Sequence, residues 1–374
     1  MDVLLVEPAY YTQYPPLGLM KLSSYNRVRS NEVKLVRGLT DVEDFNPQTI
    51  EITSLFTYAW RPVHEAIAYY HERYPCASIN VGGIYASLFP ERIKETFPYV
   101  NVQVGLNQKA DRFMPDYDIL KGTERWSQWD GSIMFTSRGC INRCPFCLVP
   151  KLEGEMRSVL KDPFSHIHPE HTRVILWDNN FLALTDWEEK IRLLSESNKW
   201  IDFNQGLDAR LMTKDKAEAL ATLKIKDIKM AYDGTHEKNA VHRAVELLED
   251  AGFSRRKISF YTLYNFYDDI SRFYDTPDEF YARVTDIIDM GCASYPMRYV
   301  PLMALSKNDY VSPFWRVDQL EAVAKARRVI GFGGAFPPYR ALVEKFQSAG
   351  SFDEAFRLEP PSVKKIGRSA EANV

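Results

Sequence analysis

Short apolar runs alternate with amphipathic segments of helical spacing through the first 120 residues. The apolar runs predict strands, which we expect at residues 3–6, 33–36, 49–56, 77–81 and 100–104. The spacing between them predicts helices over residues 17–29, 62–73 and 91–96. Alternating strands and helices of this length build parallel sheets with helices on both faces. The pattern therefore predicts an α/β, doubly wound (Rossmann-like) domain with its ligand site at the carboxyl ends of the strands.

The alternation becomes more regular from Gly131 onward. Six further strands are expected at residues 132–136, 173–177, 200–204, 227–232, 257–264 and 294–300. The intervening helices are expected near Met156 and over residues 187–197, 214–223, 240–251, 277–290 and 317–330. Six βα units are fewer than the eight of a complete (β/α)₈ barrel. The second half is thus predicted to be a partial (β/α)₆ TIM-type barrel, with its chemistry at the carboxyl ends of the strands.

These patterns suggest a division of the chain into four parts. They are an α/β domain over residues 1–120, a linker over 121–130, the partial barrel over 131–335 and a C-terminal extension over 336–374. Residues 105–130 carry no strong pattern, and the polar, basic tail after Pro361 is expected to be frayed.

Composition narrows the cellular context. A chain of 374 residues with a net charge of −3 has no basic patch to suggest nucleic acid. It has no apolar segment of membrane-spanning length and no leader-like start, so we expect a cytoplasmic enzyme without a membrane partner. Of the five cysteines, Cys76 and Cys292 lie among apolar neighbours and are expected to be buried thiols.

The other three cysteines carry the most specific signal. Cys140, Cys144 and Cys147 have CxxxCxxC spacing directly after the apolar run at 132–135. Three closely spaced thiolates can hold a [4Fe–4S] cluster. These clusters usually take four cysteine ligands, so three ligands leave one iron open to a small molecule. Two alternatives remain: a thioredoxin-like redox pair of Cys144 and Cys147, which needs a lowered thiol pKa, or a zinc site. The zinc site would add one histidine to the cysteines, with the candidates His166, His168 and His171.

The cysteine motif resembles the signature of the radical S-adenosylmethionine (radical SAM) superfamily. That signature is CxxxCxφC with an aromatic residue at φ, where this chain has Phe146. The resemblance implies that SAM chelates the open iron and is reductively cleaved to a 5′-deoxyadenosyl radical, which abstracts hydrogen from an unidentified substrate. It also implies an electron donor such as flavodoxin or ferredoxin. A cobalamin-dependent radical SAM methyltransferase is the first alternative, and a non-catalytic iron–sulfur or zinc protein is the second.

The resemblance also implies a SAM site at the ends of the expected strands. Its candidate residues are Phe146, Asp178, Asn179, Gln205, Asp208, Arg210 and Asp233. Arg210 would contact the SAM carboxylate bidentately. Other interpretations stay open: Asp178 or a neighbouring Asn can cap the following segment, the Asp208–Arg210 pair can be structural, and Asp233 stands where relatives often carry glutamate.

Three residues at later strand ends are candidates for substrate contact. Tyr264 and Asn265 end the fifth strand of the expected barrel, and Arg298 is a charged residue inside the sixth. An arginine in such a segment requires a partner, which is either the substrate or a carboxylate of the barrel interior.

The first 120 residues resemble the cobalamin-binding-type domain that precedes many radical SAM cores. The resemblance rests on the order of strands, on residues 14–19 (YPPLGL) and on Gly82-Gly83. The cobalt-ligating DxHxxG pattern is absent, because neither His64 nor His71 has the required neighbours. The domain is also short, with little chain to build a lid. These observations predict that cobalamin is unlikely to bind, and that the domain covers the carboxyl-end face of the barrel.

Overall fold

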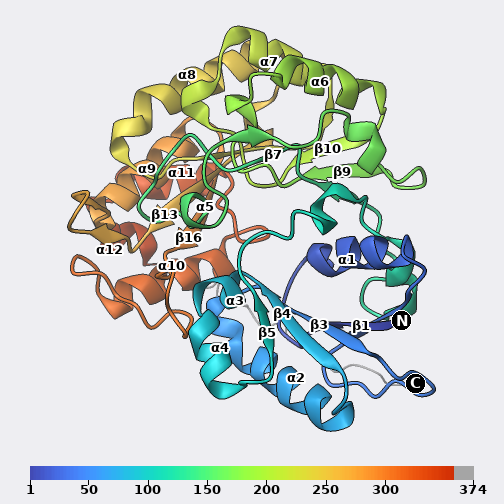
Figure 1. Cartoon of the computed structure of the whole chain (residues 1–374). Helices are drawn as coiled ribbons and strands as arrows, with labels where there is room; N and C mark the ends of the chain where they lie inside the picture. Colours follow the sequence, from blue (N-terminus) through green and yellow to red (C-terminus); the bar gives the residue numbers. More distant parts are fainter. Residues whose placement is uncertain (358–374) are drawn as a thin grey trace, which may run out of the picture.

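The first sheet of the computed structural model, which describes residues 1–357, has five parallel strands (Figure 1). They are β1 (Asp2–Glu7), β2 (Glu32–Arg37), β3 (Thr49–Ser54), β4 (Ser78–Gly83) and β5 (Asn101–Gln103). Their order is β2-β1-β3-β4-β5. This is a doubly wound order whose direction of winding reverses between β1 and β3, the place where such folds bind ligands. The predicted fold of this region is confirmed.

Helices cover both faces of this sheet. Helix α1 (Leu17–Arg27) packs on one face, and α2 (Trp60–Arg73), α3 (Ile84–Leu88) and α4 (Pro90–Thr96) pack on the other. The side chains of β1 alternate between the two cores, with Val3 on the α1 side and Leu4 on the α2 side. Burial on both faces explains why β1 is a continuous apolar run.

The segment after β5 is packed against the first sheet. Two 3₁₀ turns, η2 (Ala110–Arg112) and η3 (Asp118–Gly122), lead to Trp126, which is buried beside α1 and β1. The indole Nε1 of Trp126 donates to Oε2 of Glu7 at 3.0 Å. This packing has no local signal in the sequence, because its contacts join segments that are distant along the chain. The boundaries at residues 120 and 130 stay a prediction.

Six parallel strands follow one another in chain order through the second half. They are β6 (Ser132–Met134), β9 (Arg173–Leu176), β10 (Trp200–Phe203), β12 (Ile228–Ala231), β13 (Ile258–Tyr264) and β16 (Ala293–Arg298). Full ladders join β6 to β9, β9 to β10, β12 to β13 and β13 to β16, whereas a single parallel bridge, Leu207–Met230, connects the two groups. The strands therefore have the predicted order, with a weak junction beside the short strand β11 (Lys224–Ile225).

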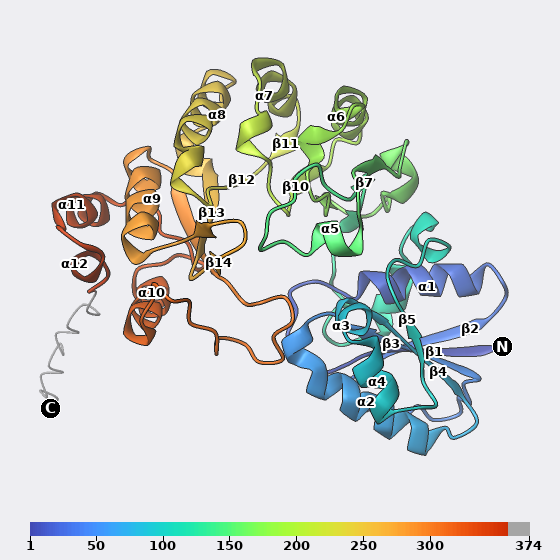
Figure 2. The ribbon, with the colours of Figure 1, turned by 60° about the vertical axis from the view of Figure 1, so that its left-hand side comes forward.

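The helices between these strands lie on their outer side (Figure 2). They are α6 (Trp187–Glu196), α7 (Lys214–Ala221), α8 (Lys238–Asp250) and α9 (Pro277–Asp289), followed after β16 by α10 (Val317–Val329). All five were predicted within a few residues of their observed bounds.

Short elements differ from the predictions. No helix forms at Met156: a one-turn helix, α5 (Val149–Leu152), comes earlier, and β8 (Arg157–Ser158) then pairs with β7 (Ser137–Arg138). A small hairpin of β14 (Tyr267–Asp268) and β15 (Phe273–Tyr274) follows β13. The sequence analysis also missed α11 (Arg340–Ser348) and α12 (Phe352–Phe356), which pack against α9 and α10. The two-residue strands and the one-turn helices are too short to show a hydrophobic period, whereas α11 is amphipathic and was overlooked.

Two remaining expectations have different outcomes. Cys292 is buried as predicted, but Cys76 is exposed, because it lies in the turn between α2 and β4 and not in the core. The tail after Pro361 lies outside the described residues. Across residues 1–357, none of the helices has both the length and the apolar character needed to span a membrane.

A buried ion pair holds the ends of β12 and β13 against α9. The Arg283 guanidinium pairs with Asp275 and also donates to the carbonyls of Tyr232 and Leu263, at 2.8 and 3.0 Å. Both side chains of the pair are 1% exposed.

Replacing Arg283 is expected to destabilise the fold strongly. Arg283→Met leaves the Asp275 carboxylate buried without its cation, which costs about 3–5 kcal/mol. The matched change Arg255→Met removes an exposed partner of Glu249 and should cost about 1 kcal/mol or less. Denaturant unfolding measures both values, and equal losses in the two variants would contradict the role given to the buried pair.

Candidate functional site

The three motif cysteines line one cavity of about 300 Å³ at the carboxyl ends of β9, β10 and β12. Other lining residues come from the segments that follow these strands and from the cysteine loop: Asn142, Phe146, Asn179, Asn180, Gln205, Asp208, Arg210, Asp233, His236 and Glu237. The cavity therefore brings together six of the seven residues predicted to bind SAM. Asp178 is the exception.

The thiols share this cavity without converging on one point. Within residues 1–357, no three His, Cys, Asp or Glu side chains are gathered closely enough to hold a metal ion. Burial raises the pKa of Cys144 to about 11, and the neighbouring Cys147 adds to this rise. Burial is also the main cause of the raised pKa of Cys147. A thioredoxin-like pair needs a lowered thiol pKa, so the structure does not support that alternative.

The histidines of the zinc alternative lie elsewhere. His171 shares a 3.0 Å hydrogen bond with Ser132, at the start of β6, and its ring packs against His168 and Tyr117. His166 lines a different cavity beside Lys21. The cysteines follow the opposite end of β6, so these histidines do not complete a site with them.

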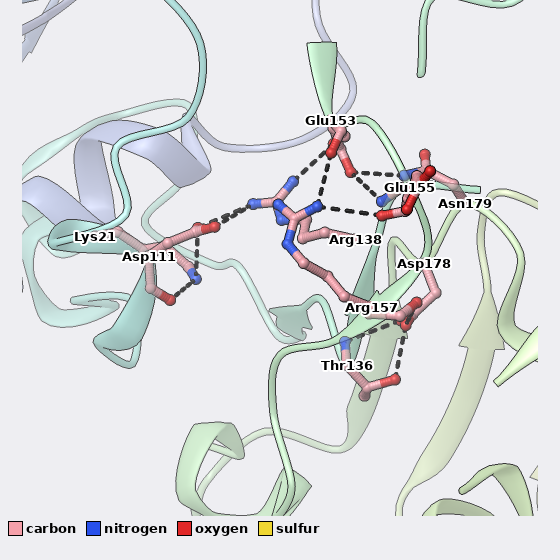
Figure 3. A network of polar contacts seen from close by, with 11 residues as sticks. Lys21, Asp111, Thr136, Arg138, Glu153, Glu155, Arg157, Asp178 and Asn179 are labelled. Carbon is pink, nitrogen blue, oxygen red and sulfur yellow. Dashed lines mark hydrogen bonds and ion pairs between the residues drawn. The ribbon is translucent and has the colours of Figure 1, made fainter. Parts of the chain in front are cut away.

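Asp178 points away from the cavity, and this is the main difference from the predicted SAM site. Its buried carboxylate accepts hydrogen bonds from the Thr136 backbone N–H at 3.2 Å and from the hydroxyls of Thr136 and Ser137 at 2.7 and 2.5 Å (Figure 3 shows the Thr136 contacts). Burial raises the pKa of Asp178, and these hydrogen bonds oppose the shift. The carboxylate therefore fixes the backbone that leads into the cysteine loop.

Asp208 is the polar centre of the cavity wall. It pairs bidentately with Arg210, both contacts being 2.8 Å, and accepts from the side-chain amides of Asn142 at 2.9 Å and Asn180 at 3.1 Å. The amide nitrogen of Asn180 also lies 3.8 Å from the Cys140 sulfur. The Asn180 Oδ1 atom is buried without a hydrogen-bond partner among the described residues, so this wall presents a free acceptor.

Asp233 and Phe146 also line this cavity. Asp233 is half-buried and accepts from the Leu263 backbone N–H at 3.2 Å, and desolvation together with the Glu237 charge raises its pKa to about 7. The Phe146 ring packs edge-on against Phe266, with centroids 5.4 Å apart. Both side chains thus border the cavity and are held by the strand ends.

The candidates for substrate contact are bonded to the protein itself. Asn265 is fully buried and bridges the backbone of Tyr310 and Ser312, at 3.0 and 2.9 Å. Arg298 donates to the carbonyls of Asn308 and Tyr310, at 2.7 and 3.2 Å. Tyr264 packs in the core against α9 and α10. Asn265 and Arg298 therefore hold the loop after β16, and Tyr264 is part of the core.

Sequence reasoning missed two residues of this region. Asn180 belongs to the same polar run as Asp178 and Asn179. Its position at the end of a strand could have identified it as a residue of the cavity. Glu153 accepts from the Asn179 amide at 2.8 Å and lies in an irregular segment, so nothing in the local sequence indicated its role.

A larger cavity of about 700 Å³ opens at the carboxyl ends of β1 and β3, where the first sheet reverses its winding. Trp177, Met297 and Lys307 of the second half of the chain form part of its wall. A cavity of about 380 Å³ beside β4 and β5 shares Gly18 and Thr53 with it. The two cavities are therefore adjacent, and we refer to them together as the β1–β3 cleft, which residues of both halves of the chain line.

Two polar atoms of residues in this cleft are buried without a hydrogen-bond partner in the described part of the chain. They are Oε1 of Glu7 and Nε1 of Trp177. One is an acceptor and the other a donor, so a large ligand with amide groups would fit the polar character of the walls.

No protein-family model and no curated protein matches this sequence. The solved structures that share its fold include two with a TM-score of 0.60 and 14% sequence identity. One is the radical S-adenosylmethionine methyltransferase TsrM from Kitasatospora setae with cobalamin and a [4Fe–4S] cluster bound. The other is the same enzyme with its tryptophan substrate and the SAM analogue aza-SAM. The matches cover 81% of this chain and 77% and 75% of the TsrM chains.

The chain therefore has the fold of TsrM, a radical SAM methyltransferase, over 81% of its length. The resemblance predicted from the cysteine motif and the strand order is confirmed at the level of the fold, and both neighbours are enzymes of the predicted class.

The expectation that cobalamin is unlikely is contradicted, because a structure with this fold contains cobalamin. The first 120 residues alone have too little chain to enclose a large cofactor. In the structure, the second half of the chain supplies the missing wall through Trp177, Met297 and Lys307.

Replacing Asp178 is expected to loosen the cysteine loop. Asp178→Ala leaves the donors of Thr136 and Ser137 unpaired, and losing hydrogen bonds to a buried charge costs about 1.5–3 kcal/mol. The control Asp162→Asn changes an exposed carboxylate that caps a 3₁₀ turn, where Asn serves equally well. Hydrogen exchange of residues 136–140 should accelerate only in Asp178→Ala, and unchanged exchange there would argue against the bracing role.

Proposed function

We propose that this chain is a cobalamin-dependent radical SAM methyltransferase. The observation that carries the proposal is that a cavity at the carboxyl ends of β1 and β3 lies beside the cysteine-lined cavity. Tyr14 lines the larger cleft, and its hydroxyl accepts a hydrogen bond from the amide of Asn204, next to Gln205 in the cysteine-lined cavity. Cofactors in the two spaces would therefore be neighbours.

Cys140, Cys144 and Cys147 would hold the [4Fe–4S] cluster, and SAM would lie in the same cavity. When bound, the reduced cluster supplies an electron for SAM cleavage, and cobalamin supplies a carrier for the methyl group. Arg210 would neutralise the SAM carboxylate while Asp208 orients its guanidinium. Asn179, Asn180 and Gln205 would bind the other polar groups of SAM, and Phe146 and Asp233 would also line its site.

Methyl transfer is better supported than hydrogen abstraction without cobalamin. The large cleft at the β1–β3 ends and the cobalamin in a structure of the same fold both favour it. Hydrogen abstraction by a 5′-deoxyadenosyl radical uses the same cysteine cavity but gives the larger cleft no role. An electron donor such as flavodoxin or ferredoxin, available in the cytoplasm, would reduce the cluster.

The cysteine triad should be required for iron binding. Anaerobic reconstitution should give about four irons per chain and an electron paramagnetic resonance signal that changes when SAM is added. Alanine at any one of the three positions should abolish that signal, because one iron loses its thiolate ligand. Cys292→Ala and Cys76→Ala are the controls and should retain it. Zinc as the only stoichiometric metal after anaerobic purification would refute the cluster.

The β1–β3 cleft should retain cobalamin. Hydroxocobalamin added during anaerobic reconstitution should remain bound at about one equivalent after gel filtration. Gly18→Leu should reduce retention without removing iron, because Gly18 lies where the two cavities of the cleft meet and an added Cβ there contacts nothing within 4 Å.

The matched control is Gly122→Leu. An added Cβ at Gly122 also meets nothing within 4 Å, but this residue is outside the cleft lining, so retention should stay at the wild-type level. Complete loss of cobalamin from the wild-type protein on desalting would contradict the methyltransferase proposal.

A further inference from the structure

A single carboxylate closes the cysteine loop at its base. Oε2 of Glu153 accepts from the Gly139 backbone N–H at 3.0 Å and from the Asn179 amide at 2.8 Å, and Oε1 accepts from Arg138 at 3.0 Å (Figure 3). Gly139 has φ +78°, and a Cβ there would lie 2.2 Å from the Glu155 carbonyl oxygen. The entry and exit of the loop therefore lie against each other, and Glu153 joins both to the segment after β9.

Arg138 connects this carboxylate to the first sheet. Its guanidinium donates to both oxygens of Asp111 at 2.9 Å and lies over the Phe135 ring, 3.4 Å from the centroid. Asp111 in turn pairs with Lys21 of α1 at 3.1 Å. Figure 3 shows this path of alternating charges from α1 to the cysteine loop.

The pair is well placed to act on a cluster electrostatically. The side chains of Arg138 and Glu153 are 8% and 12% exposed, and water and salt screen such charges much less than surface charges. Charges and hydrogen bonds near an iron–sulfur cluster are among the factors that set its reduction potential. Both residues are also close to the cysteines along the chain. Glu153 directly follows α5, the short helix after Cys147, and Arg138 precedes Cys140 by two residues.

We propose that Arg138 and Glu153 are positioning residues that hold the cysteine loop against the first sheet and, by their opposite charges, tune the reduction potential of the cluster. The inference rests on the proposed function, because it requires a cluster at the three cysteines. A negative charge near the cluster opposes the added electron, and a positive charge favours it. Removing each charge alone should therefore move the potential in opposite directions.

The test is a redox titration of anaerobically reconstituted protein, followed by electron paramagnetic resonance without SAM or cobalamin. Glu153→Gln should raise the midpoint potential and Arg138→Gln should lower it. The double variant should return towards the wild-type value. Glu153→Asp keeps the charge and should stay closer to wild type than Glu153→Gln.

Arg157→Gln is the matched control. Arg157 begins β8, directly after the cysteine loop, and donates to the carbonyls of Glu153 and Glu155, at 2.7 and 3.3 Å, but it is exposed. The same loss of charge there should leave the potential unchanged within error.

Shifts of the same sign in Glu153→Gln and Arg138→Gln, or no shift in either with full iron content, would overturn the inference and leave the proposed function standing. If Arg138→Gln does not fold, the comparison of Glu153→Gln with Glu153→Asp still decides: equal potentials in these two variants would overturn the tuning role. Absence of iron from the wild-type protein would overturn the proposed function, and this inference with it.

Discussion

The whole arrangement depends on parallel strands of the two halves of the chain, whose carboxyl ends border neighbouring cavities. The first sheet reverses its winding between β1 and β3, and a cleft of about 700 Å³ opens there. The second set of strands ends at the cavity that holds the three cysteines. Backbone groups at strand ends have no partners within the ladder, so these ends are where irregular segments and polar side chains gather. Neither half of the chain encloses the larger cleft alone.

Buried charges hold the segments around the cysteine-lined cavity in place. Asp178 fixes the residues before the cysteine loop, Glu153 closes the loop, and Arg138 joins it to Asp111. On the far side, Arg283 and Asp275 hold the ends of β12 and β13. A buried charge that loses its partner costs several kcal/mol. The loop that carries the cysteines is irregular in backbone and is therefore held by specific polar contacts, whereas the strands around it are held by apolar packing.

The sequence predicted the regular elements because their signals are local. The apolar run of β1 and the helical spacing of α8 are visible without any tertiary information, and the cysteine spacing identified the loop. It could not predict the packing of Trp126, the turn that exposes Cys76 or the role of Glu153, since each depends on contacts between distant segments. Asp178 was predicted to bind SAM because it follows the end of a strand. The strand end is where we predicted it, but the sequence does not show which way the side chain points. The cobalamin prediction was wrong for a different reason: it considered the first 120 residues alone, and Trp177 and Met297 supply a wall that those residues lack.

A crystal structure of anaerobically reconstituted protein with SAM and hydroxocobalamin tests the central claim most directly. It should show a four-iron cluster on Cys140, Cys144 and Cys147, with SAM beside Arg210. The corrin ring should lie over the carboxyl ends of β1 and β3, against Trp177. Zinc at the cysteines, or cobalamin bound away from the β1–β3 cleft, would contradict a single site shared by the two halves of the chain.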